Sequence, residues 1–81
     1  MQVKVRLFAS LREAAGQEVC YLELSEGATV AEAWAELCMR DPKLAARHNR
    51  VLCALNQRYV QPSAALREGD EVAFFPPVSG G

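Results

Sequence analysis

Long hydrophobic runs are absent from the sequence. The longest apolar stretch, VAFFPPV, contains two prolines and is far shorter than the roughly 18 residues of a membrane-spanning helix. At the N-terminus, Lys4 and Arg6 interrupt the apolar residues of MQVKVRLF, so the hydrophobic region of a signal peptide is also missing. The sequence therefore predicts no membrane association.

An excess of charge of either sign is missing too. The 81 residues carry a formal net charge of −1, and the isoelectric point is near 5.8. Nucleic-acid-binding domains usually gather a basic excess on one face, so we expect proteins or small molecules as partners rather than nucleic acid. The length allows one hydrophobic core and therefore one domain.

The sequence has three cysteines, and no two of them are close together along the chain. Cys20, Cys38 and Cys53 form no CxxC pair for a metal or a redox disulfide, and their odd number favours a reducing cytoplasm. Each lies on the apolar side of a predicted element, where cysteine behaves as a small buried hydrophobe. We therefore interpret all three as core residues.

Residues typical of catalytic sites are few. His48 is the only histidine and lies in a charged segment without a partner at a telling spacing, which indicates a solvated loop residue. Glu68 and Asp70 are more typical of a turn than of an acid and base pair. There is no glycine-rich phosphate loop, so the sequence predicts neither a bound metal nor a bound cofactor.

Alternating apolar and polar residues predict strands. The alternation is clearest in QVKVRLF and EVCYLEL, while VLCAL is a short apolar run suited to a buried strand. Asn56 and Gln57 predict a turn into a short strand, and Gly69 with Asp70 predicts a turn into a closing strand. The expected strands are residues 2–8, 18–24, 51–55, 58–60 and 71–75.

One substantial helix is expected. Thr29 and Glu32 have the spacing of a capping box, and apolar residues at helical spacing follow them. The helix should end near Arg40, because the residue before Pro42 avoids helical geometry. Residues 44–50 then form a polar connection with room for one helical turn.

A shorter helix is expected between the first two strands. Ser10 lies three residues before Glu13, which is the spacing of a capping box, and Gly16 is a suitable stop. A hairpin, a helix that crosses it and further strands predict a two-layer α+β fold. If the last strand lies parallel to the first, the fold is the ubiquitin-like β-grasp, with four to five strands and one main helix over residues 1–75.

The aromatic residue at the end of the closing strand attracts attention. In EVAFF, Val72 and Phe74 share one face, which leaves Phe75 on the other. Phe75 is either a partly covered edge residue or a protein contact, because exposed aromatics are common interface anchors.

The six residues 76–81 form a predicted flexible tail. Pro76 and Pro77 cannot donate ladder hydrogen bonds, so the strand must end there, and the tail can extend roughly 20 Å at about 3.3 Å per residue. Gly80 and Gly81 would let a narrow channel close around bare backbone. The reactive group at its tip is the α-carboxylate of Gly81. From the residues alone, a functional tail and a frayed terminus are equally open interpretations.

Three segments resemble the small, sulfur-carrier subunit of molybdopterin synthase. They are FASLRE, LNQRYV and, most specifically, LREGDEVAFFPPVSGG, and the similarity spans almost the whole chain. Ser79 stands where threonine is usual in that family. The resemblance implies a β-grasp fold and a carrier that is not itself the catalytic subunit.

The resemblance also implies a chemical cycle and its partners. A ubiquitin-activating-like adenylyltransferase would consume ATP to adenylate Gly81, and a sulfur donor protein would convert it to a thiocarboxylate. Gly80, Ser79, Val78, Pro77 and Pro76 would thread into the large synthase subunit, and Phe75 with Arg12 would dock on it. The sulfur would pass to a cyclic pterin precursor, in a synthase with two copies of each subunit.

Three related functions and one inert alternative compete with this interpretation. The sulfur carrier of thiamine biosynthesis shares the fold and the terminal glycines but lacks the FFPPV lead-in. A tungsten-cofactor version of the synthase subunit and a ubiquitin-like protein modifier also fit. An interaction module with an inert tail is the remaining alternative.

Overall fold

The structure is a computed structural model that describes residues 1–47 and 51–77. Within these residues the chain forms five strands and three helices. The strands are β1 (Gln2–Leu7), β2 (Val19–Glu23), β3 (Leu52–Leu55), β4 (Arg58–Tyr59) and β5 (Glu71–Phe75). The helices are α1 (Ser10–Ala15), α2 (Val30–Arg40) and α3 (Pro42–Arg47).

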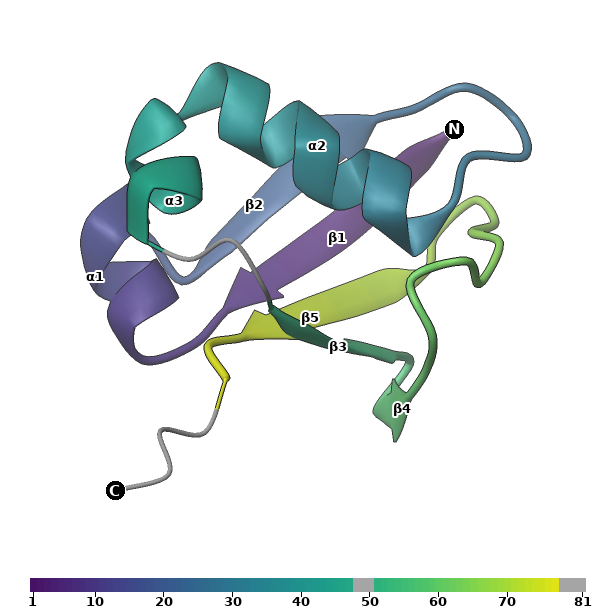
Figure 1. The fold of residues 1–81 in the computed structure, drawn as a ribbon. Coiled ribbons are helices and arrows are strands. Elements are labelled where there is room, and N and C mark those ends of the chain that lie inside the picture. The colour runs from purple at the N-terminus through teal and green to yellow at the C-terminus, as the bar shows by residue number, and fades with distance from the viewer. Residues whose placement is uncertain (48–50, 78–81) are drawn as a thin grey trace.

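All five strands form one mixed sheet in the order β2-β1-β5-β3-β4 (Figure 1). The first strand, β1, pairs antiparallel with β2 and parallel with β5, so that Val5 lies beside Val72. On its other side β5 pairs antiparallel with β3. The last strand in the sequence is therefore central in the sheet, and the parallel pairing that the β-grasp requires is present.

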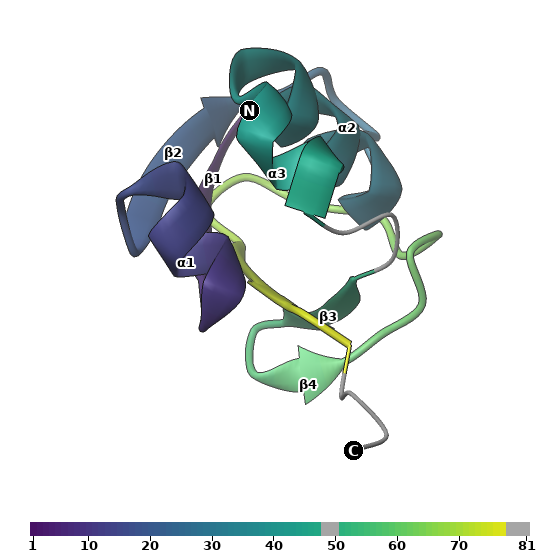
Figure 2. The same cartoon turned by 60° about the vertical axis from the view of Figure 1, so that its left-hand side comes forward.

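The helices lie on one face of this sheet and leave the other face open (Figures 1 and 2). Residues that alternate along β1 and β5 point toward the helices and are fully buried, as are several leucines from the helices and β2. We call the sheet face away from the helices the outer face. The largest fully buried side chains are Phe74, Leu7, Leu11, Leu22, Leu44, Val3, Val5, Val30 and Val72.

The start of α2 has the predicted capping box. The Thr29 hydroxyl accepts a hydrogen bond from the Glu32 backbone N–H at 3.2 Å, and the Glu32 carboxylate accepts one from the Thr29 N–H at 2.9 Å. These two bonds satisfy donors that a helix start leaves unpaired. The helix ends at Arg40 with Asp41 as its C-cap, as the following proline predicts.

Two expectations about the other helices are wrong. The N-cap of α1 is Ala9 rather than Ser10, because the Glu13 N–H donates to the Ala9 carbonyl and the chain turns sharply at Ala9 with φ of 54°. Residues 44–47, expected to lie in a polar connection with room for one turn, belong to a six-residue helix, α3, that begins at Pro42. Its Leu44 is buried against the core, and that burial stabilises the helix.

Both predicted turns are present. Asn56 and Gln57 have φ of 50° and 72°, and this left-handed pair joins β3 to β4. Gly69 has φ of 83°, and the Asp70 carboxylate accepts the Arg67 N–H at 2.7 Å. Asp70 therefore stabilises a turn, in agreement with the sequence-based interpretation.

Within the described ranges, none of the helices has the length and apolar character needed to cross a bilayer. The interpretation of His48 concerns a residue outside these ranges, as do the expectations for residues 78–81.

Candidate functional site

The open, outer face of the sheet ends in aromatic residues beside the start of the tail. Along β5, Val72 and Phe74 are buried under the helices, whereas Ala73 and Phe75 lie on the outer face. No described helix covers this face (Figure 2). The predicted side of the sheet for Phe75 is therefore confirmed.

Phe75 does not stand alone there. Its ring stacks on that of Phe8, with centroids 4.7 Å apart and planes inclined by 13°, and the Tyr59 ring lies 6.0 Å away at 44°. Phe75 is half-buried by these contacts, and Tyr59 is 75% exposed. We call Phe8, Tyr59 and Phe75 the aromatic cluster.

Strand pairing brings the cluster together from three distant segments. The parallel register places Leu7 beside Phe74, so the next residues, Phe8 and Phe75, meet where both strands end. Tyr59 arrives through the β3–β4 hairpin, in which it pairs with Ala54. A partner that contacts these rings contacts the end of the sheet from which the tail departs.

Charged side chains border the cluster. The Arg6 guanidinium lies over the Phe8 ring at 5.1 Å, and it also forms an ion pair with Glu18 at 3.4 Å. Further along the same face, Lys4 pairs with Glu71 at 3.5 Å. The cluster and its neighbours line a shallow hollow of about 240 Å³. An apolar centre with a charged rim is the usual composition of a protein interface.

The tail begins directly at this cluster. β5 ends at Phe75, Pro76 is half-buried and Pro77 is exposed. The remaining predicted tail residues, Val78, Ser79, Gly80 and Gly81, lie outside the described residues.

Arg12 is exposed on α1, the helix that follows Phe8 at the end of the sheet where β5 also ends (Figure 1). In residues 1–47 and 51–77, no ion pair involves its guanidinium. Phe75 and the helix that carries Arg12 therefore lie at the same end of the molecule.

The sequence analysis assigned no role to Phe8, Tyr59 or Arg6. A signal for Phe8 and Arg6 was present, because the alternation of the first strand places both on the same side as Lys4. The position of Tyr59 follows from the register of a two-residue strand, which alternation cannot predict.

The three cysteines are not prepared for nucleophilic chemistry. Burial raises the pKa of the Cys53 thiol, which is 5% exposed and donates a hydrogen bond to the Val60 carbonyl at 3.3 Å. Burial also raises the pKa of Cys20, against the opposing effect of Arg40, and of Cys38, together with Asp41. Neutral thiols packed on the core agree with the sequence-based interpretation.

No three metal-binding side chains gather anywhere in the described portion of the chain. The side chains that converge at the end of the sheet are aromatic and cationic, which suits a protein surface better than an ion.

A five-stranded mixed sheet with a parallel pair at its centre and helices on one face defines a ubiquitin-like β-grasp protein. The sequence profile of the ThiS family matches residues 5–81, so the chain belongs to the ThiS family.

The chain is similar over almost its full length to molybdopterin synthase sulfur carrier subunits and to small archaeal modifier proteins. The molybdopterin synthase sulfur carrier subunit of Chlamydomonas reinhardtii is 43% identical over 83 residues, and the match covers 100% of both chains. The crystal structure of small archaeal modifier protein 1 from H. volcanii has a TM-score of 0.87 and 29% identity, over 95% of this chain and 98% of that one.

A further solved structure shares the fold alone. It is the complex of subunits 1 and 2 of the molybdopterin-converting factor from Helicobacter pylori, with a TM-score of 0.68 and 23% identity. The match covers 100% of this chain and 100% of that one.

Proposed function

We propose that this protein is the sulfur carrier subunit of a molybdopterin synthase and that Gly81 carries the sulfur. The observation that carries the proposal is the extent of its similarity to the Chlamydomonas subunit, which is 43% identical over 100% of both chains. The aromatic cluster supports it, because it provides an apolar contact surface at the base of the tail.

The proposed chemistry takes place on the terminal carboxylate. A carboxylate is ionised at neutral pH and is a poor acyl donor, so it needs activation. In the proposed cycle its oxygen attacks the α-phosphorus of ATP on an adenylyltransferase, pyrophosphate leaves and a glycyl adenylate forms. The terminal sulfur of a persulfide on a donor protein then displaces AMP and forms an acyl disulfide. Attack of a thiol on the donor's own sulfur forms a new disulfide and releases the glycyl thiocarboxylate.

The second half of the cycle needs a large subunit. The proposed tail, Pro76 to Gly81, threads into the partner's active site, while Phe75 and Arg12 contact its surface. The thiocarboxylate gives its sulfur to a cyclic pterin precursor, and hydrolysis returns the Gly81 carboxylate. The carrier binds no cofactor in this scheme, acts in the cytoplasm and forms a heterotetramer with two large subunits.

Intact mass spectrometry tests the carrier role. After incubation with the adenylyltransferase, ATP and a sulfur donor, we expect the mass gain for one oxygen replaced by sulfur. A chain that lacks Gly81 should not gain this mass. The same gain in the truncated chain would place the sulfur elsewhere and overturn the assignment of Gly81.

A ubiquitin-like modifier is the second candidate, and the likeness to small archaeal modifier protein 1 favours it. In that case the activated glycine would form isopeptide bonds with lysines. Peptides with a C-terminal remnant of this chain on lysine, found by mass spectrometry of cell extracts, would support the modifier. Sulfur transfer to the pterin precursor in the presence of a purified large subunit would support the carrier.

A further inference from the structure

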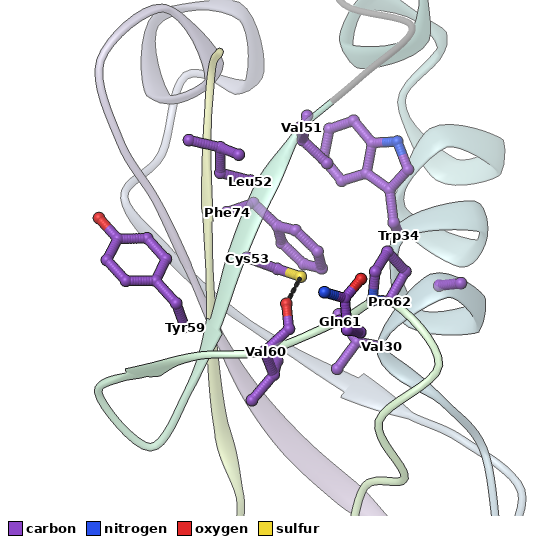
Figure 3. Close-up of a pocket in the computed structure, with 11 residues that line it drawn as sticks. Val30, Trp34, Val51, Leu52, Cys53, Tyr59, Val60, Gln61, Pro62 and Phe74 are labelled. Carbon is purple, nitrogen blue, oxygen red and sulfur yellow. Dashed lines mark hydrogen bonds between the residues drawn. The ribbon is translucent and has the colours of Figure 1, made fainter. Parts of the chain in front are cut away.

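A second hollow, larger than the one beside the aromatic cluster, lies on the helix side of the sheet, next to β3 and β4. It has a volume of about 540 Å³ and opens between α2 and the start of β3 (Figure 3). Such a volume is in the ~300–1,000 Å³ range of ligand pockets. We call it the Trp34 groove, and its main walls are Val30, Trp34, Val51, Cys53, Val60 and Pro62.

The groove exists because the chain leaves the sheet soon after the short strand β4. Among the described residues, the last backbone hydrogen bond between the segment that follows β4 and β3 joins the Val60 N–H to the Cys53 carbonyl at 3.2 Å. Pro62 has no N–H for a further ladder bond, and its carbonyl accepts the Ala31 N–H of α2 at 2.9 Å. The segment is thereby drawn toward the helix, and the wedge that it leaves beside β3 stays open.

Most of the described residues that line the groove are apolar. The Trp34 ring is tilted against Phe74 at 5.0 Å, and the Cys53 thiol is already bonded to the Val60 carbonyl. The Gln61 amide is a polar group at this site, and it faces the same space (Figure 3). No Asp, Glu, Lys or Arg is among the described lining residues. An uncharged apolar group is therefore the suitable occupant.

The groove continues into the outer face. Tyr59 borders both the Trp34 groove and the hollow beside the aromatic cluster. Leu52 borders the groove, is 42% exposed and pairs with Phe75 across β3 and β5. One apolar surface therefore extends from Phe75 around the β3–β4 edge to Trp34.

We propose that the large subunit which docks on the outer face also reaches around this edge and inserts an aromatic or large aliphatic side chain into the Trp34 groove. This inference rests on the proposed function. It adds a second anchor on the helix side of the sheet, whereas the aromatic cluster lies on the outer face. Two anchors on different faces would fix the orientation of the carrier while its tail occupies the active site.

Substitutions on α2 separate this inference from the docking of the outer face. Ala31 is exposed and borders the groove, so the Ala31→Glu side chain would obstruct its mouth. Acidic residues are favourable near a helix N-terminus, so the helix should tolerate it. Ala35→Glu is the matched control, because Ala35 is exposed on the same helix but does not border the groove.

Affinity for the purified large subunit from the same organism is measured by calorimetry. We expect Ala31→Glu to weaken binding at least about tenfold and Ala35→Glu to stay within about twofold of the unsubstituted chain. Equal binding by both variants, together with weakened binding by Phe75→Asp, would overturn the second anchor and leave the proposed function intact. Failure of the unsubstituted chain to bind would overturn the proposed docking and this inference with it.

A fluorine label reports the occupant directly. Trp34 is the only tryptophan, so 5-fluorotryptophan gives one ¹⁹F resonance in this chain. The resonance should shift on addition of the unlabelled large subunit, and this shift should be lost with Ala31→Glu. If the ¹⁹F resonance shifts when this chain alone is concentrated, without the large subunit, the groove binds a second copy of the chain and the proposal is overturned. A bound small molecule in the native mass spectrum would overturn it in favour of a free ligand.

Discussion

Phe8 and Phe75 are 67 positions apart in the sequence, yet their rings stack almost in parallel with centroids 4.7 Å apart. The contact exists because the first and last strands of the sheet are parallel neighbours that end together. It produces an apolar surface where β5 ends. An interface anchor that is already ordered loses little side-chain entropy on binding.

Phe75→Asp tests this surface. We expect the variant to lose about 1 kcal/mol of stability, because the stacking on Phe8 is lost, and to remain folded. Its affinity for the large subunit should fall about 30-fold or more, since an anchoring aromatic can contribute ~2 kcal/mol or more. Calorimetry measures the affinity, and chemical denaturation measures the stability.

Tyr21→Asp is the control for this experiment. Tyr21 is also an exposed aromatic, but it lies on the edge strand β2, which β1 separates from β5. Equal losses of affinity in the two variants would indicate a general charge effect and contradict the specific role of Phe75.

Gly80→Val tests the width of the threaded tail. A β-branched side chain restricts the backbone and thickens the segment that must enter the partner. We expect an unchanged melting temperature and a strongly reduced rate of sulfur transfer in a single-turnover assay. Transfer at the full rate would show that the two glycines serve another purpose.

Leu44→Ala tests the helix that the sequence pattern did not reveal. Leu44 is 1% exposed, and its truncation should cost about 2–5 kcal/mol in the free energy of unfolding. Met39→Ala, at an exposed position of α2, should change the same quantity by no more than about 0.5 kcal/mol. A loss below 1 kcal/mol for Leu44→Ala would mean that α3 contributes little to the core.

Cys53 should make stability depend on alkaline pH. Burial raises the pKa of its thiol in the folded state, so the unfolded chain releases this proton first as the pH rises. The stabilising contribution is complete below the ordinary thiol pKa of about 8.5 and is lost above it. Between about pH 8 and 9.5, Cys53→Ala should therefore lose less stability than the unsubstituted chain. Parallel stability profiles would contradict this prediction.

The sequence predicted those parts of the fold whose determinants are local. The alternation in QVKVRLF and EVAFF, the capping box of Thr29 and Glu32, and the turn at Asn56 each depend on neighbours within a few residues, and each was confirmed. The side of the sheet on which Phe75 lies belongs to the same group.

Features that depend on distant neighbours were not predicted. The helix over Pro42–Arg47 is stabilised by the buried Leu44, and a helix of six residues is too short to show a periodic pattern. The α1 cap falls at Ala9 because the Phe8 N–H is held by the Phe74 carbonyl, and this leaves one residue for the turn into the helix. The aromatic cluster likewise needs the β1–β5 register and the β3–β4 hairpin, neither of which periodicity determines.

The central position of β5 has a mechanical consequence. A pull on the C-terminus, such as withdrawal of the tail from a tight channel, acts along this strand through Pro76. Because β5 is bonded to β1 on one side and to β3 on the other, the load is applied in shear to two ladders of hydrogen bonds at once. These bonds must yield together rather than one after another, as they would in a strand peeled from an edge. The fold therefore resists unfolding most strongly when force is applied along β5 from the C-terminus.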